Sequence, residues 1–213
     1  SIYRHKGIRL KGAEIKDLGL MHYDKAWEMM SHAVRDRSSE QADEIWLAEH
    51  HPVYTLGYAA SDANIISNKD IPVIRTDRGG QVTYHGPGQL MIYFLLNLKR
   101  LKWGPKKLIC ELEDLLIKLL KNNGIKGERV PGAPGIYVNG KKIASIGLKI
   151  KKGFCYHGIS LNVDLDLMPF DNIVTCGIDS LEVTQMKNFL DISIDKVKLD
   201  LINLLKDQHH KAA

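Results

Sequence analysis

Three cysteines are the candidate nucleophiles of this 213-residue chain. Cys110 lies in the leucine-rich run LICELEDLLIKLL, so we expect a structural residue that is packed or partly exposed. Cys155 alternates with apolar residues in FCYHGISLNV, so we expect it to be a packed structural residue. Cys176 differs because it precedes Gly177 in the turn-rich stretch NIVTCGID, where a loop can present the sulfur and leave backbone N–H groups free. Cys176 is therefore the candidate nucleophile, and a structural role stays open on this observation alone.

A thiol at its ordinary pKa reacts slowly at neutral pH and needs a basic or cationic neighbour. Histidine can fill that role, and the candidates near expected strands or loops are His50, His51, His85 and His157. Each could equally be a hydrogen-bonded structural residue. Spacing does not decide, because Cys/His partners meet in space rather than in sequence.

Lys142 carries a further signal in the segment KKIASIGLKI. If this segment is a regular strand, Lys142 shares a face with four apolar residues, Ala144, Ile146, Leu148 and Ile150. Burial would lower the pKa of this lysine and suit it to accept a proton. On this pattern alone, the simpler interpretation is that Lys142, close to a turn, reaches water.

The glycine-rich stretch RGGQVTYHGPGQ, from Arg78 to Gln89, could bind a ligand through its backbone N–H groups. It lacks the GK[ST] ending of a P-loop, and the apolar run LMIYFLLNL that follows predicts a strand instead of a dinucleotide-binding helix. Gly147, in the middle of an expected strand, suggests a bulge or the close approach of a ligand to the backbone. The stretch is therefore a poor match to a nucleotide site.

Three pieces of the chain, RGGQVTYHGPGQ, KKIASIG and Cys176-Gly177, closely resemble the lipoyl(octanoyl) transferase family in their order and spacing. Further similarity runs through EHHPVYTLG, PGIYVNGKKIASIG and HGISLNV, so the resemblance covers most of residues 10–185. The fold of this family is similar to the catalytic fold of biotin protein ligases and lipoate ligases. The resemblance thus implies a single α+β domain with mixed sheets flanked by helices.

The resemblance implies transfer of an octanoyl or lipoyl group from acyl carrier protein to a lysine of lipoyl domains, the first step of endogenous protein lipoylation. The acceptors would be the E2 subunits of 2-oxoacid dehydrogenases and the glycine cleavage H protein. Cys176 and Lys142 would form a catalytic dyad that passes through an acyl-cysteine thioester, without a metal or cofactor. The acyl substrate would be bound by Arg78, Gly79, Gly80, Gln81, Val82, Thr83, Tyr84, His85, Ser145, Ile146, Gly147, Gly158, Ile159 and Ser160.

Other functions remain to be weighed against this one. An ATP-dependent lipoate-protein ligase on the same fold would activate the acid as an adenylate and would need no nucleophilic cysteine. A basic RNA-binding module would show salt-sensitive RNA affinity. A catalytically silent relative that only binds lipoyl domains is disfavoured, because both Cys176 and Lys142 are present.

The hydrophobic pattern predicts the elements that must position these residues. It predicts helices at 23–37, 108–120 and 194–206, strands at 8–16, 72–76, 90–98 and 154–163, two strands within 44–56 broken at 51–52, and a hairpin of strands 136–138 and 142–150 around an Asn-Gly turn. Because regular βαβ alternation is missing, we expect one α+β domain over 1–213 with frayed tails at 1–6 and 208–213. A small appended unit after about residue 184 is the alternative.

Composition sets the remaining expectations. The chain is 44% hydrophobic and 26% charged, with no apolar run near the ~20 residues of a membrane span and no signal peptide. The odd number of cysteines, without metal-type spacing, favours a reducing cytoplasm and no zinc site. The net charge of +5 comes with lysine clusters at 99–107, 118–126 and 141–152, which indicate a solvated surface or an acidic protein partner before RNA. We expect a monomer that binds neither nucleic acid nor membrane.

Overall fold

The computed structural model of the chain describes residue 10 and residues 12–174 and 182–206. Its elements, in chain order, are β1 (Glu14–Met21), α1 (Tyr23–Arg35), β2 (Glu44–His50), β3 (Val53–Leu56), η1 (Asp62–Asn64), β4 (Val73–Arg75), β5 (Val82–His85), β6 (Gln89–Asn97), α2 (Leu98–Leu101), α3 (Pro105–Asn122), β7 (Glu128–Val130), β8 (Ala133–Val138), β9 (Lys141–Lys151), β10 (Phe154–Asn162), η2 (Met168–Asn172), η3 (Met186–Asn188) and α4 (Ile194–Lys206). A seven-stranded sheet has the order β1-β2-β6-β10-β9-β8-β7, and a three-stranded sheet has the order β4-β3-β5. The β1–β2 and β3–β4 pairs are parallel and the other pairs antiparallel, so both sheets are mixed.

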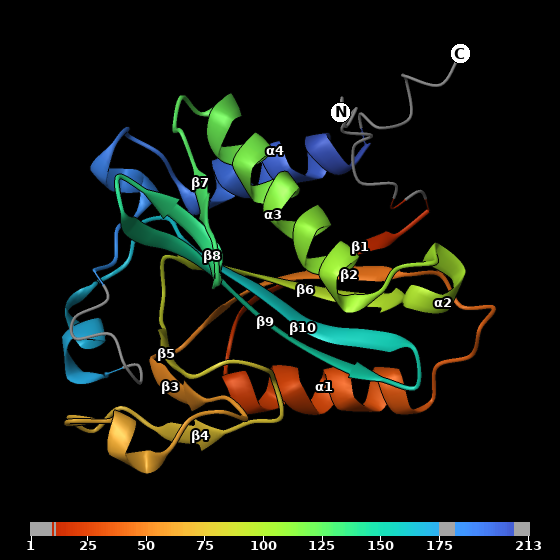
Figure 1. Cartoon of the computed structure of the whole chain (residues 1–213), viewed down its shortest axis with the longest axis horizontal. Helices are drawn as coiled ribbons and strands as arrows, with labels where there is room; N and C mark the ends of the chain where they lie inside the picture. The colour runs from red at the N-terminus through yellow and green to blue at the C-terminus, as the bar shows by residue number, and fades with distance from the viewer. Residues whose placement is uncertain (1–9, 11, 175–181, 207–213) are drawn as a thin grey trace.

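The large sheet is covered on both faces, by α3 and α4 on one side and by α1 on the other (Figure 1). Strand β6 at its centre shows the consequence. Leu90, Ile92, Phe94 and Leu96 pack into the α3/α4 core, whereas Met91, Tyr93 and Leu95 pack toward α1. A strand buried on both faces has no side for polar residues, which explains why LMIYFLLNL is apolar throughout.

Most of the predicted elements are confirmed. α4 has its predicted bounds, and the break at His51-Pro52 separates β2 from β3. Asn139 and Gly140 have φ of 51° and 78°, the two left-handed residues that a type I′ turn requires. The strand predicted at 8–16 is wrong in its bounds, because β1 begins at Glu14, after a turn at Gly12 with φ of 82°.

The C-terminal helix belongs to the same core as the rest of the chain. Val197, Leu201 and Leu204 of α4 lie in one buried cluster with the leucines of α3, so the alternative of an appended unit is wrong for residues 182–206. The tails predicted to fray, 1–6 and 208–213, lie outside the described residues. Within the described part of the chain, no helix is long and apolar enough to cross a membrane.

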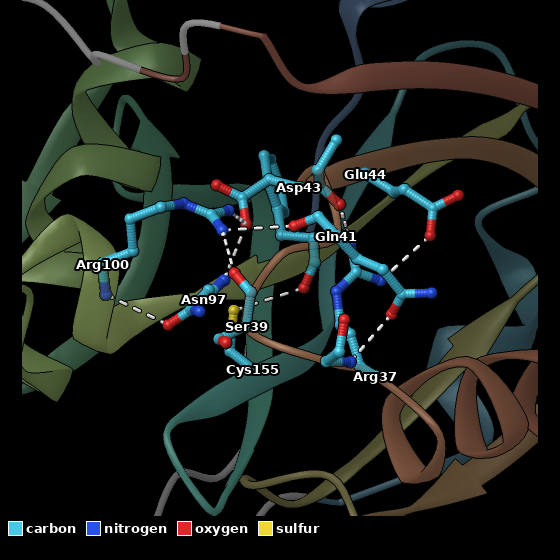
Figure 2. Close-up of polar contacts among 11 residues, drawn as sticks. Arg37, Ser39, Gln41, Asp43, Glu44, Asn97, Arg100 and Cys155 are labelled. Carbon is cyan, nitrogen blue, oxygen red and sulfur yellow. Dashed lines mark hydrogen bonds and ion pairs between the residues drawn. The ribbon is translucent and has the colours of Figure 1, made fainter.

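A polar cluster ties the loop before β2 to α2 (Figure 2). Arg100 donates to the carbonyls of Ser39 and Gln41 and to the Asp43 carboxylate, 2.6 Å away. The Asn97 N–H donates to the same carboxylate oxygen at 2.7 Å. These bonds hold the start of β2 in place. The Arg100 guanidinium also neutralises the buried carboxylate of Asp43.

Candidate functional site

A cavity of about 860 Å³ lies between the three-stranded sheet and the large sheet, with walls from β5, β9, β10 and η2. This volume is in the range of small-molecule binding sites. Most of the residues predicted to bind the acyl substrate meet in its wall, together with Lys142: Arg78, Gly80, Gln81, Val82, Thr83, His85, Ser145, Ile146, Gly147, Gly158, Ile159 and Ser160.

Two of the predicted binding residues lie elsewhere. Gly79 lines a neighbouring cavity of about 430 Å³, and its N–H donates to the Leu148 carbonyl at 2.8 Å. Tyr84 packs between Tyr54 and Phe170 in the core of the smaller sheet, because alternation along β5 points it away from Thr83 and His85. The binding role of both residues therefore stays a prediction, and it would have to be indirect for Tyr84.

Gly147 makes room for the 78–80 loop on the sheet, and its neighbour Gly158 makes room for the backbone of β6. The two residues are cross-strand partners in β9 and β10. A Cβ on Gly147 would lie 2.9 Å from the Gly79 carbonyl oxygen, and one on Gly158 would lie 2.0 Å from the Ile92 carbonyl oxygen. The close approach expected at Gly147 is thus made by the backbone of the chain's own loop.

Lys142 faces the cavity for a different reason from the one the sequence suggested. Ile136 of β8 pairs with Ala144 of β9, but the next residue, Tyr137, pairs with Lys142, so β9 carries one extra residue at Ile143. Such a bulge inverts the alternation of faces. The expectation that Lys142 shares a face with Ala144 is therefore wrong, because Ala144 lies in the α3/α4 core and Lys142 lines the cavity.

The surroundings of Lys142 favour its neutral form. Burial lowers its pKa by desolvation, and the positive charge of Arg78 lowers the pKa further. Its Nζ lies 5.8 Å from the centre of the Tyr137 ring, and its Cε lies where a side chain on Gly135 would stand. The inward orientation that the sequence suggested is present, and it makes Lys142 a candidate proton acceptor.

Cys176, the candidate nucleophile, lies outside the described residues, in the stretch 175–181. The residues that flank that stretch lie at the cavity. Val174 and Glu182 both line the cavity. Asn64 holds Val174 through two hydrogen bonds of 2.8 Å, and the Lys142 N–H donates to the Glu182 carbonyl at 2.9 Å. Both ends of the stretch therefore lie at the cavity wall, and the Glu182 end lies beside Lys142.

Arg78 is a buried cation in the cavity wall. Its guanidinium donates to the hydroxyl and carbonyl of Thr55 and to the carbonyls of Gly79 and Gln81. All of these acceptors are neutral, so its positive charge acts on the cavity, and burial lowers its pKa by desolvation. Arg78 therefore anchors the glycine loop to β3 and repels a second cation nearby.

His85 has both ring nitrogens engaged by protein groups. Nε2 lies 3.1 Å from the Thr55 hydroxyl, and Nδ1 lies 2.7 Å from Gln89 Oε1. Burial lowers its pKa to about 3, so the ring is neutral. Because neither ring nitrogen is left for a substrate, His85 forms part of the cavity wall. It neither hydrogen-bonds the substrate nor acts as a base.

Sequence reasoning missed Asp77 and misplaced His157. The Asp77 carboxylate accepts from Tyr156 and lies 2.7 Å from His157 Nε2; these bonds lower its pKa to about 2 against the effect of burial. Cys155 packs in the core as expected, but His157, with φ of 64°, turns to the cavity side of β10. A left-handed residue breaks the alternation on which the shared face was based. Among the described residues, no cluster of His, Cys, Asp or Glu could hold a metal ion.

A family model and curated relatives match the chain. The model of the lipoyl protein ligase A/B catalytic domain matches residues 22–206. An octanoyltransferase from Vibrio atlanticus (strain LGP32) is 48% identical over 172 residues, which cover 81% of this chain and 78% of that protein. An octanoyltransferase from Chromobacterium violaceum is also 48% identical, over 82% of this chain and 84% of that protein.

Solved structures share the fold. A lipoate-protein ligase A bound with ATP superposes with a TM-score of 0.80 at 16% identity, covering 93% of this chain and 85% of that chain. A biotin protein ligase from Aquifex aeolicus has a TM-score of 0.59 at 15% identity, covering 92% and 69%. The expected likeness to both ligase folds is confirmed. By sequence, this chain belongs to the octanoyltransferase family, and it is an acyltransferase.

Proposed function

We propose that this enzyme transfers an octanoyl group from acyl carrier protein to lipoyl-domain lysines through a thioester on Cys176. The observation that supports this most is the buried Lys142 with its lowered pKa, in a cavity whose wall contains both ends of the stretch that carries Cys176. Lipoyl domains as protein substrates fit the names of its relatives. The donor and the covalent step are our inference.

In the first half-reaction, neutral Lys142 takes the proton of the Cys176 thiol. The thiolate attacks the carbonyl carbon of the octanoyl thioester, the bond to the carrier sulfur breaks, and Lys142 gives its proton to the departing carrier thiolate. Desolvation of the lysine promotes this return of the proton, because burial disfavours its ammonium form. The products are octanoyl-Cys176 and a free carrier thiol.

In the second half-reaction, the amine of the acceptor lysine attacks the carbonyl carbon of octanoyl-Cys176. Lys142 takes a proton from the attacking nitrogen and returns it to the departing Cys176 thiolate, so the enzyme is regenerated. An amide replaces a thioester, so the exchange is downhill and requires no ATP. Apolar residues in the cavity wall, such as Ile146, Ile159 and Phe170, exclude water from the thioester.

The surface gives the proposed donor a place to approach. The Leu98 N–H donates to the Gly153 carbonyl at 2.9 Å, which brings the start of α2 beside the β9–β10 turn. The exposed lysines of α2, its C-terminal cap and the β9–β10 turn are Lys99, Lys102, Lys151 and Lys152. They would attract an acidic carrier protein, and added salt would slow that encounter. We also propose that the enzyme is a monomer and that it works in the cytoplasm, where the free thiols of Cys110 and Cys155 would stay reduced.

Intact-mass spectrometry after mixing with octanoyl carrier protein, without ATP, tests the proposal. The wild-type protein should gain one octanoyl group, Cys176→Ala should gain none, and Lys142→Ala should gain it slowly. Cys110→Ala is the matched control, because Cys110 is an exposed thiol on α3 and should not affect the adduct. An adduct that persists in Cys176→Ala would overturn the covalent mechanism. A requirement for ATP would instead indicate a ligase.

A further inference from the structure

A row of buried polar side chains connects Arg78 to the backbone beside Lys142. From the glycine loop it runs through Thr55 of β3, His85 of β5, Gln89 of β6 and Asn162 of β10 to the carbonyl of Thr184. The successive distances are 2.7 Å from the Arg78 guanidinium to Thr55 Oγ1, then 3.1, 2.7, 3.0 and 3.1 Å. The five residues that accept these hydrogen bonds are all buried. The most exposed of them, Asn162, has a relative accessible surface of 5%.

Every hydrogen bond in this row points the same way. Arg78 can only donate, and the Thr184 carbonyl at the other end can only accept. Gln89 Oε1 faces His85 Nδ1, which must therefore carry the ring proton, and neutral Nε2 accepts from the Thr55 hydroxyl. The Gln89 amide nitrogen faces the Tyr84 carbonyl and Asn162 Oδ1, so the orientation of both amides is set. Bonds aligned in this way polarise and strengthen one another.

At the Thr184 end of the row, residues 182–184 take the place of β10 beside the start of β9. Pairing between β9 and β10 ends at Ala144 and Leu161. Beyond that point, β9 is bonded on this side by residues 182–184: Lys142 donates to the Glu182 carbonyl and accepts from the Thr184 N–H, both at 2.9 Å. Asn162, the next residue of β10, reaches the Thr184 carbonyl with its side chain.

We propose that Gln89 and Asn162 are positioning residues for acyl transfer: they hold segment 182–184 on β9 and so fix the backbone from which Lys142 enters the cavity. Lys142 lies beside the bulge at Ile143. The pairing between β8 and β9 is interrupted there, so this pairing alone cannot fix the backbone of Lys142. The consequence for catalysis rests on the proposed role of Lys142. The anchoring of segment 182–184 does not, and it can be measured separately.

Hydrogen exchange on the resting protein tests the anchor. In Asn162→Leu, the amides of Lys142 and Thr184 should exchange about tenfold faster than in wild type. The reason is that segment 182–184, which both amides depend on, loses its buried hydrogen bond from Asn162 to the Thr184 carbonyl. Gln89→Met, which keeps the length of the side chain, should act in the same direction and remains informative if Asn162→Leu folds poorly. Unchanged exchange in both folded variants would overturn the anchor.

Asn97→Leu is the matched control. Asn97 has the same 5% exposure as Asn162 and lies on neighbouring β6, but it accepts from the Arg100 N–H in the cluster of Figure 2 and does not line the cavity. It should lower the melting temperature while leaving the exchange of Lys142 and the acylation rate as in wild type. If Asn97→Leu slows acylation as much as Asn162→Leu does, the effect follows stability and the proposal fails.

Acylation kinetics then test the catalytic consequence. At saturating octanoyl carrier protein, Asn162→Leu and Gln89→Met should form the adduct roughly 10²-fold more slowly, with little change in the half-saturating concentration. The pH at which the rate is half-maximal should rise, because a lysine released toward water is protonated more easily. Wild-type rates and pH profiles in both variants would overturn the positioning role. Absence of an adduct on wild type would instead overturn the proposed function, and the exchange result would stand by itself.

Discussion

At the scale of single residues, Arg78 has the largest influence on the cavity. Its charge is buried among neutral acceptors, and it lowers the pKa of both Lys142 and His85. The same guanidinium ties the loop to Thr55 through three donor–acceptor pairs. One residue therefore sets the shape of the loop and, together with burial, favours the neutral form of Lys142. A flexible ammonium could not do both, because it lacks the planar fork of donors.

Arg78→Lys should therefore be costly although it keeps the charge. We expect the free energy of unfolding to fall by about 2–4 kcal/mol, because several buried acceptors lose their donor. Urea unfolding at pH 7 measures this. Arg75→Lys is the control, since its side chain is 53% exposed and the change should stay within about 0.5 kcal/mol. Equal effects of the two substitutions would contradict the role assigned to Arg78.

At the scale of elements, the contact between the 78–80 loop and β9 shapes the cavity. Gly79 donates to the Leu148 carbonyl, and Gly147 leaves the space that the Gly79 carbonyl and the Arg78 side chain occupy. The loop is thus fastened to the large sheet on one side and, through Arg78, to the small sheet on the other. The loop can occupy this position only because residue 147 is a glycine and has no side chain there.

Gly147→Ala should move this loop without unfolding the protein. The new Cβ would lie 2.9 Å from the Gly79 carbonyl oxygen and 3.2 Å from Arg78 Cδ, so the loop must shift. We expect the rate of octanoyl adduct formation to fall at least about tenfold, since small displacements of substrate-positioning groups have large effects on rate. Gly104→Ala, at a position with open space and an ordinary φ, should leave the rate unchanged. A wild-type rate in Gly147→Ala would show that the loop does not position the substrate.

At the scale of the whole molecule, buried histidines make the fold sensitive to acid. Burial lowers the pKa of His50 to about 4 and that of His85 to about 3, whereas both titrate near 6.5 in the unfolded chain. Below pH 6.5 the unfolded state binds more protons, so stability is fully present above 6.5 and declines as the pH falls toward 4. Asp77 titrates near 2 and does not contribute within this window.

The free energy of unfolding should therefore fall by about 1.4 kcal/mol per pH unit for each of these histidines between pH 6 and pH 5. Urea unfolding at pH 7, 6 and 5 measures the slope. His50→Gln removes one of these titrating groups and should reduce the slope by about 1.4 kcal/mol per pH unit. A free energy that stays constant from pH 7 to pH 5 would contradict the neutral, buried state of both rings.

Much of this architecture was predictable from local patterns. The stripe of leucines in α3, the bounds of α4 and the Asn139-Gly140 turn follow from periodicity and turn chemistry, which depend on neighbouring residues alone. Errors arose where the backbone departs from regular geometry: the bulge at Ile143 and the left-handed His157. An alternation rule assumes an unbroken strand, so one extra residue or one positive φ reverses its conclusion.

The sequence by itself determined the family and the fold class, and it predicted the residue types of the site, because glycines, Lys142 and Cys176 occur in a specific order and spacing. The tertiary structure decided which of them meet. It placed Arg78 and Lys142 in one wall, removed Tyr84 from it, and connected Gln89 through Asn162 to Thr184. Those contacts join strands distant in the chain, and their hydrogen bonds are made only when the sheets pack.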